Sequence, residues 1–327
     1  MMKHFRFYLL TLLLCAAAGV GLWLFTAGNR VAGGAELKEK PLTLAMTASI
    51  RLPESLRLFD RTIAINDMEI YERLDRELTI FTYQHGSTML SIKRANRYFP
   101  MIERILKEQG VPDDFKYLAV VESALDYKAV SPAKAAGMWQ FMESTGKMYG
   151  LEISAQVDER LDVGKATLAA CKYLKNAYRE YDDWMLAAAS YNAGKGRITG
   201  ELEKQKGDVF FDLWLNEETT RYLYRIMAIK EVFEHPYRYG FVIKPEHLYP
   251  VIDYKELEIT TSIPDLASFA KEKGYTYAEL KRANPWLRDR SLTVKDKYYT
   301  ILLPDKKSLH RTPHSKIKVH DPRWVEE

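Results

Sequence analysis

Glu122 has the setting in this sequence that most clearly suggests chemistry. It follows the apolar run 117–121, and a helix here would place Phe115, Leu118 and Glu122 on one face. A carboxyl group held against apolar neighbours resists ionisation, so its pKa rises and it keeps its proton near neutral pH. Such a group can act as a general acid. The alternative is an ordinary amphipathic helix on which Glu122 faces water.

Two segments downstream of Glu122 carry further side chains that could complete a site. Residues 131–146 mix small, aromatic and amide-bearing residues, among them Ser131, Gln140, Phe141 and Met142. Residues 189–194 read Ala-Ser-Tyr-Asn-Ala-Gly.

These segments resemble the lytic transglycosylases of bacterial cell-wall metabolism, whose catalytic domain is lysozyme-like. That family carries Glu-Ser, Gly-x-x-Gln-x-Met and Ala-x-Tyr-Asn-Ala-Gly motifs, which match Glu122-Ser123, residues 137–142 and residues 189–194 in order and spacing. The resemblance covers residues 90–234. The membrane-associated subgroup, in which LysM modules follow the catalytic domain, is the most similar because residues 139–142 and Glu218-Thr219 with Tyr222 fit that variant.

The resemblance implies a reaction for Glu122. The carboxyl group would protonate the oxygen that leaves the MurNAc-GlcNAc β-1,4 bond. The carboxylate would then remove a proton from the MurNAc 6-hydroxyl, which closes on C1 to give a 1,6-anhydro ring without water. Ordinary glycosidases use two carboxylates, and the substrate's acetamido group could replace the second one here. A lysozyme-type hydrolase, in which Glu122 activates water, remains an alternative. A non-catalytic wall-binding scaffold is a further one, although it would not need a poised acid.

Four residues near the second motif would contact substrate if the resemblance holds. Ser131 and Gln140 would orient the acetamido group or a glycan hydroxyl. Phe141 and Met142 would cover the sugar face, although packing in the core explains both equally well.

Three residues later in the chain complete the predicted site. Tyr191 would donate a phenolic hydrogen bond near the acid, and Asn192 would shape the turn that aims it. Glu218 matches a family carboxylate that supports the site from a later helix, and the adjacent Glu217 is the alternative for this role.

Composition sets the broad class of protein. The 327 residues are 47% hydrophobic, which suits one large and one small domain. The net charge of +4 is spread along the chain, so no nucleic acid is expected, while an anionic wall polymer is compatible. Scattered histidines and the absence of a phosphate-binding glycine loop predict no metal and no cofactor. Cys171 reads as a buried packing residue on a helix.

The amino-terminal segment indicates export. Lys3 and Arg6 precede the apolar stretch 7–25, which is long enough to cross a bilayer as a helix and to leave the rest on the periplasmic side of the cell envelope. We expect an uncleaved membrane anchor within residues 1–30; a cleaved signal peptide is the alternative, and a lipoprotein modified at Cys15 is less favoured. Residues 31–70 would be a tether to the catalytic domain.

The remaining pattern predicts a mainly α fold. The catalytic domain is assigned to residues 71–240, and its expected helices are 89–109, one from 112 through Glu122, 163–181, 184–191, 194–205 and 217–233.

A linker, 241–255, leads to a small domain at 256–305 with the order β-α-α-β: a strand at 257–259, helices at 263–273 and 277–283, and a strand at 298–303. This domain resembles a LysM module, a glycan-binding fold, in residues 276–285 and 301–304. It departs from the usual Gly-Asp-Thr-Leu signature at residues 262–266, so a purely structural appendage is the alternative. Residues 306–327 form a basic tail whose composition predicts no packed structure.

Overall fold

The computed structural model describes residues 48–311 and 316–325, and the part from Ser49 onward groups as one compact unit. The predicted anchor at 7–25, the signal-peptide alternative and Cys15 lie outside the described residues. Within the described ranges, every helix is too short or too polar to pass through a bilayer.

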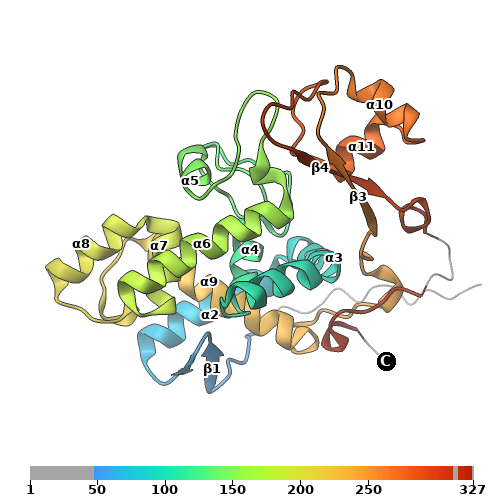
Figure 1. Ribbon diagram of the computed structural model, residues 1–327. Helices are drawn as coiled ribbons and strands as arrows, with labels where there is room; N and C mark the ends of the chain where they lie inside the picture. Colours follow the sequence, from blue (N-terminus) through green and yellow to red (C-terminus); the bar gives the residue numbers. More distant parts are fainter. Residues whose placement is uncertain (1–47, 312–315, 326–327) are drawn as a thin grey trace, which may run out of the picture. The chain divides into compact units, whose positions relative to one another are not determined.

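The larger part of the described chain is helical (Figure 1). Its helices are α2 (Met68–Tyr83), α3 (His85–Gln109), α4 (Phe115–Ser123), α5 (Glu143–Met148), α6 (Val163–Tyr181), α7 (Trp184–Ala193), α8 (Lys195–Gln205) and α9 (Glu217–Glu234). Helix α9 packs along α2 and also contacts α4 and α7, while α6 packs against α3 and α7. Short 3-10 turns lie at Glu159–Leu161, Phe210–Asp212, Pro236–Tyr239, Pro245–His247, Lys306–Leu309 and Pro322–Trp324.

Helix α4 lies in the core of this domain. Every residue from Phe115 to Val121 is buried, including Lys116, whose ammonium group pairs with Glu103 and Asp113. A nine-residue helix is too short to be stable alone, so packing against α3 and α9 must hold it. Because the core holds α4 in one position, it also fixes the direction of the Glu122 side chain.

The chain before α2 forms a hairpin, which corrects the part of the predicted tether (31–70) that covers residues 55–64. Strands β1 (Ser55–Leu58) and β2 (Arg61–Ala64) pair antiparallel, with Leu56 opposite Ile63. Leu58 is fully buried in the catalytic core, and α2 begins at Met68 with Asp67 as its N-cap. The part of the predicted tether at 31–47 lies outside the described residues.

The C-terminal domain, residues 254–304, has the predicted β-α-α-β order. It contains β3 (Tyr254–Ile259), α10 (Leu266–Glu272), α11 (Tyr277–Ala283) and β4 (Tyr299–Pro304), with β3 and β4 paired antiparallel. Asn284, fully buried, ties α11 to β4: its amide donates to the Leu302 carbonyl over 2.7 Å and its Oδ1 accepts from the Leu302 N–H over 2.7 Å. The predicted mainly α fold with a small C-terminal domain is therefore confirmed.

The chain's end packs against the catalytic domain, contrary to the prediction from its composition. Trp324 is 2% exposed, its ring contacts Phe99 and Phe233, and its indole N–H donates to the Phe233 carbonyl over 3.0 Å. His320 lies 2.9 Å from the Glu103 carboxylate. Residues 316–325 therefore belong to the catalytic core rather than to an unstructured tail.

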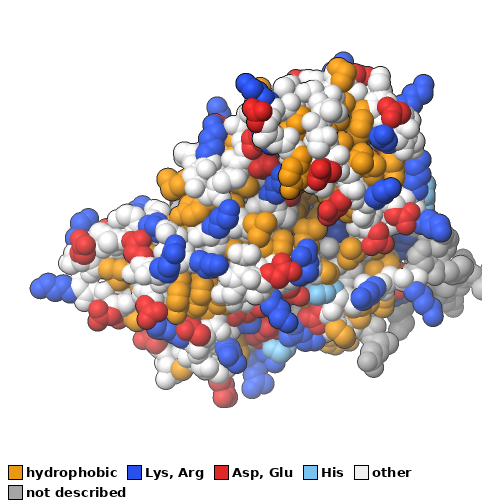
Figure 2. All heavy atoms as spheres, in the orientation of Figure 1, with side chains coloured by type: hydrophobic (Ala, Val, Ile, Leu, Met, Phe, Trp, Pro, Cys, Tyr) orange, Lys and Arg blue, Asp and Glu red, His pale blue; other side chains and the backbone are white. Residues whose placement is uncertain are grey.

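Two other predictions from composition agree with the structure. Cys171 is fully buried on α6, and burial raises the pKa of its thiol to about 12, as expected for a packing residue. Figure 2 shows acidic and basic side chains interspersed over the displayed face, which fits a net charge of only +4.

Candidate active site

Glu122 occupies the last turn of α4, at the edge of the buried core. The next residues, Ala124 and Leu125, both have left-handed backbone conformations, with φ of 52° and 58°. Two such residues in a row turn the chain sharply away, and conformations of this kind cost energy that the surrounding structure must offset. The turn leaves Glu122 partly accessible at the helix end. A negative charge is also disfavoured there by the helix dipole.

The surroundings of Glu122 raise its pKa to about 7. Burial is the main cause, because an ionised carboxylate loses hydration in an apolar setting. A hydrogen bond from Tyr222 and the positive charge of Arg225 oppose this effect, while the negative charge of Glu218 adds to it. Glu122 can therefore hold or release a proton near neutral pH, as the sequence pattern predicted.

Helix α9 supplies the polar groups that face Glu122. The Tyr222 hydroxyl donates a hydrogen bond to Glu122 Oε1. Arg225 donates to the Val121 carbonyl over 3.2 Å, beside the acid. Glu218, Tyr222 and Arg225 lie four and three residues apart, so they share one helix face. Tyr222 falls in a motif that gave it no role, and Arg225 was not predicted. Their spacing could have indicated a shared helix face, but not that this face meets Glu122.

The two candidate carboxylates at the start of α9 have different surroundings. Glu217 pairs with Arg76 at 2.5 Å and with Arg73 at 3.5 Å, both on α2. Glu218 is exposed, and its charge acts on Glu122. Of these two carboxylates, Glu218 is therefore the one whose charge influences the pKa of Glu122.

Residues 129–141, here called the site loop, carry Ser131 and Gln140. The Ser131 hydroxyl accepts from the Ala135 N–H over 3.0 Å. The Gln140 amide donates to the carbonyls of Ala129 at 3.1 Å and Gly137 at 2.8 Å. With both amide hydrogens engaged, the group that Gln140 can still offer a glycan is its carbonyl oxygen. Gln140 also has a left-handed backbone (φ 48°), a strained conformation of the kind that clusters at functional sites.

Three hydrogen bonds fix the site loop to the helices around Glu122. The Ser123 hydroxyl, next to the acid, donates to the Met138 carbonyl over 2.8 Å. The Trp139 indole donates to Thr167 on α6 over 2.9 Å. The Tyr191 hydroxyl donates to the Trp139 carbonyl over 2.8 Å, so the phenol that donates to Glu122 is Tyr222 rather than Tyr191.

The other predicted contact residues differ in accessibility. Phe141 is 2% exposed and packs edge-on against Tyr191, which favours the packing interpretation, whereas Met142 is 44% exposed. Asn192 accepts a hydrogen bond from the Thr219 hydroxyl over 3.1 Å and so links α7 to α9. Within residues 48–311 and 316–325, no three His, Cys, Asp or Glu side chains gather as a metal site would require.

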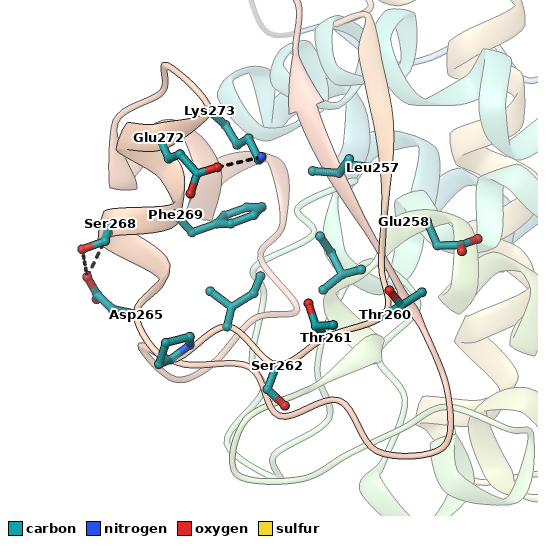
Figure 3. A pocket seen from close by; sticks show the side chains of 13 residues that line it. Leu257, Glu258, Thr260, Thr261, Ser262, Asp265, Ser268, Phe269, Glu272 and Lys273 are labelled. Carbon is teal, nitrogen blue, oxygen red and sulfur yellow. Dashed lines mark hydrogen bonds and ion pairs between the residues drawn. The ribbon is translucent and has the colours of Figure 1, made fainter.

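A second candidate site is a pocket of about 580 Å³ in the C-terminal domain (Figure 3). Hydroxyl-bearing side chains of the β3–α10 connection line one side, and the Phe269 ring of α10 lines the other. Asp265, within the segment that departs from the LysM signature, caps α10 by accepting from the Ser268 N–H over 2.8 Å. The departing segment thus has a structural role and also borders the pocket.

The fold and the site together define the class of protein: a lysozyme-like helical domain with one carboxyl group of raised pKa, followed by a small β-α-α-β domain. Residues 99–210 match the family model described as Transglycosylase SLT domain. Residues 255–307 match the Soluble lytic transglycosylase C-terminal LysM-like domain. The chain therefore belongs among the proteins that carry an SLT domain followed by a LysM-like domain.

Two of the similar proteins are named as transglycosylases. The chain is 30% identical over 245 residues to membrane-bound lytic murein transglycosylase D of Escherichia coli K12, a match that covers 72% of this chain and 52% of that protein. It is 31% identical over 137 residues to the peptidoglycan transglycosylase gp16 of phage T7, covering 40% of this chain and 10% of that protein. The chain thus spans about half the length of the murein transglycosylase D that it matches.

Among solved structures, the 70 kDa soluble lytic transglycosylase of Escherichia coli is 25% identical. That match has a TM-score of 0.37 and covers 44% of this chain and 24% of the other.

Proposed function

We propose that this protein is a peptidoglycan lytic transglycosylase that cleaves the MurNAc-GlcNAc β-1,4 bond without water. The observation that carries the proposal is the setting of Glu122, a partly accessible carboxyl group with a pKa of about 7 and a phenol as its hydrogen-bond partner. The SLT-domain match and the names of the relatives support the same reaction class.

Glu122 would act twice in the proposed reaction. The protonated carboxyl group gives its proton to the glycosidic oxygen as the C1–O bond breaks, and the GlcNAc side leaves as an alcohol. The resulting carboxylate accepts the proton of the MurNAc 6-hydroxyl, whose oxygen forms a bond to C1. The product is a 1,6-anhydro ring, and Glu122 ends the cycle protonated. A pKa near the working pH suits both steps.

The oxocarbenium-like transition state needs stabilisation that a second carboxylate provides in ordinary glycosidases. The other carboxylate whose charge acts on Glu122 is Glu218, and it is exposed at the start of α9. We therefore assign this stabilisation to the substrate's own acetamido group. Ser131, Gln140 and Asn192 are the polar side chains proposed to orient the sugar, with Met142 against its apolar face.

A digestion experiment tests the proposal. Purified peptidoglycan is incubated with the protein, and the released muropeptides are weighed by mass spectrometry. Products that lack one water relative to hydrolysed fragments support the lyase. Hydrated products would identify a lysozyme-type hydrolase instead, and no release would favour a wall-binding scaffold. Glu122→Gln keeps the shape of the side chain but cannot exchange the proton, so this variant should stay folded and release nothing.

We also propose that the LysM-like domain contacts glycan at the pocket of Figure 3. An aromatic face opposite several hydroxyl groups suits a sugar, because the ring packs on C–H groups while the hydroxyls exchange hydrogen bonds. Binding of the protein to insoluble peptidoglycan should weaken when Phe269 is replaced by Ala. Unchanged binding would return this domain to a purely structural role.

Finally, we propose that residues 7–25 anchor the protein in the membrane, with the catalytic domain on the periplasmic side. The apolar length of the segment and the name of the membrane-bound relative support this location. Mass spectrometry of the mature amino terminus tests it. An intact segment is expected, whereas loss of residues up to a small-residue cleavage point would identify a signal peptide.

A further inference from the structure

The SLT domain and the LysM-like domain share a packed contact built by a hairpin of the catalytic domain. In this docking hairpin, residues 152–159, the Glu159 N–H donates to the Glu152 carbonyl over 2.9 Å. Val157 at its tip is 1% exposed and belongs to the hydrophobic core of the LysM-like domain, where it pairs with Leu287 as an isolated β-bridge. The small core is therefore completed by a residue of the catalytic domain.

Hydrogen bonds fix the docking hairpin to the segment that follows α11. The Asp158 N–H donates to the Trp286 carbonyl over 2.8 Å, and the Arg288 N–H donates to the Gln156 carbonyl over 2.7 Å. The Gln156 side chain adds two bonds, one to the Ser291 hydroxyl at 3.0 Å and one from the Thr293 N–H at 3.2 Å. Backbone pairing of this kind sets a defined register, which a flexible tether would not require.

The base of the docking hairpin is held as well. Lys297 Nζ lies 2.7 Å from Glu152 Oε2, and the Tyr299 hydroxyl donates to Glu152 Oε1 over 2.9 Å. Lys297 and Tyr299 belong to the LysM-like domain, and the Tyr299 ring stacks on Trp286. Both ends of the hairpin are thus attached to the same neighbouring domain.

A buried ion pair leads from the docking hairpin to the site loop. The Asp158 carboxylate accepts from Arg160 Nε at 2.9 Å and from Arg160 Nη2 at 2.8 Å. Arg160 Nη1 donates to the carbonyls of Lys134 at 3.0 Å and Phe141 at 3.1 Å, at two points of the site loop. Asp158 and Arg160 are 9% and 8% exposed. Separating the pair would therefore leave a buried charge without a partner, which is strongly destabilising.

The site loop also lies directly against the backbone of Arg160. A Cβ atom built on Gly137 would fall 1.8 Å from the Arg160 carbonyl oxygen, and Gly137 has a φ of 82°. Only glycine fits at this position. A small displacement of residues 158–160 would therefore move Gly137 and the adjacent Met138, which Ser123 links to the end of α4 beside Glu122.

We propose that the LysM-like domain positions the site loop: by holding Val157 and Asp158 it fixes Arg160, and Arg160 fixes the site loop beside Glu122. Val157, Asp158 and Arg160 are then positioning residues for the transglycosylase reaction, and this inference rests on the proposed function. The domain contributes to turnover itself and not only to retention on the wall.

The test compares a soluble substrate with the insoluble wall, using full-length variants. Gln156→Ala removes the two side-chain bonds across the contact, and Val157→Ser removes the apolar tip. With a soluble GlcNAc-MurNAc tetrasaccharide, which gains nothing from attachment to the wall, we expect kcat to fall about tenfold or more at nearly unchanged KM, because a misplaced reacting group slows the bound complex. Val157→Ile keeps an apolar side chain at this position, so this variant should have the same kcat as the unmodified protein.

A matched control separates this effect from loss of stability in the small domain. Thr276 is the N-cap of α11, and its hydroxyl accepts a hydrogen bond from the Glu279 N–H over 3.1 Å. Thr276→Ala removes this cap, and Thr276 does not take part in the contact described above. It should leave kcat on the tetrasaccharide unchanged. Unchanged kcat in Gln156→Ala and Val157→Ser, with slower release from sacculi only, would overturn the proposal and leave the domain as a tether.

Hydrogen exchange gives a readout that does not depend on activity. In Gln156→Ala and Val157→Ser, the backbone amides of residues 135–141 should exchange faster than in the unmodified protein and in Thr276→Ala. Unchanged exchange there would overturn the positioning role even if activity falls. If the unmodified protein releases no product from the tetrasaccharide or from the wall, the proposed function fails, while the exchange measurement still decides the contact.

Discussion

At the scale of single residues, opposing influences set the proton affinity of Glu122. Burial favours the neutral form, and the Tyr222 hydroxyl and Arg225 favour the ionised form. Neither influence alone would give a group that donates a proton and then accepts one in the same cycle. The resulting pKa of about 7 allows both at neutral pH.

Replacing Tyr222 by Phe should shift the pH dependence of the reaction. The lost hydrogen bond stabilises the carboxylate, so its removal raises the pKa of Glu122 further. The alkaline limb of kcat/KM, where the acid loses its proton, should move to higher pH, and the maximal rate should fall because the carboxyl group is less well oriented. Tyr191→Phe removes a bond to a backbone carbonyl instead and should leave the limb in place. A limb that moves to lower pH in Tyr222→Phe would contradict this account.

Glu122 should also destabilise the folded protein at alkaline pH. Its folded pKa of about 7 lies above the ordinary value of 4.5, so the folded state binds the proton more tightly than the unfolded chain. Stability is therefore fully present below pH 4.5 and falls as pH rises through 7, by up to about 3 kcal/mol. Glu122→Gln removes this penalty and should unfold at a higher temperature than the unmodified protein at pH 8, with little difference at pH 4. Glu143→Gln, on an exposed side chain of α5, should show no such pH-dependent gain.

The predictability of the site depends on how local each signal is. The role of Glu122 could be predicted from the apolar run before it and from its helix face, because both signals lie in a short stretch of consecutive residues. Tyr222 and Arg225 approach the acid from α9, about a hundred residues later, and only the tertiary packing of α9 on α4 brings them there. The contact roles of Ser131, Gln140, Met142 and Asn192 stay predictions, because they depend on a bound sugar.

At the scale of elements, several helices and the strands β3 and β4 were predicted, whereas helix α2 and the strands β1 and β2 were overlooked. The bounds of α6 and α11 agree with the sequence pattern, because periodic apolar residues and end signals coincide there. The hairpin β1–β2 was overlooked, since Pro53 and the surrounding charges suggested an irregular segment. The period-two alternation of Leu56 with Leu58 and of Ile63 with Ile65 was the signal that indicated it.

A substitution in this hairpin shows whether it belongs to the catalytic fold. Leu58 is fully buried, so Leu58→Ala should lower the free energy of unfolding by about 2–5 kcal/mol in a denaturant titration. Thr62→Ala, at an exposed position of β2, is the control and should change it by less than about 0.5 kcal/mol. Equal effects of the two substitutions would show that residues 55–64 act as a tether and do not stabilise the catalytic domain.

At the scale of the whole chain, composition led to the wrong prediction that residues 316–325 have no packed structure. Basic and polar residues predominate there, yet Ile317, Val319 and Trp324 alternate with them and pack on the catalytic core. A count of charges averages over such spacing and cannot detect it. The contact also joins distant parts of the sequence: the amide of Asn96 on α3 donates to the Lys318 carbonyl over 3.2 Å, and its Oδ1 accepts from the His320 N–H over 2.8 Å.

Trp324 should therefore stabilise a domain whose active site lies far from it in sequence. Trp324→Ala removes the aromatic contacts with Phe99 and Phe233 and should lower the free energy of unfolding by about 3–5 kcal/mol. Trp214→Ala is matched in chemistry but acts on an indole that is 80% exposed, so it should cost much less. Thermal and denaturant unfolding of both variants measure the difference. Because Phe99 and Phe233 stand on α3 and α9, and both helices pack on α4, loosening them should also lower the temperature at which activity is lost. Similar stabilities of the two variants would show that the end of the chain is dispensable to the fold.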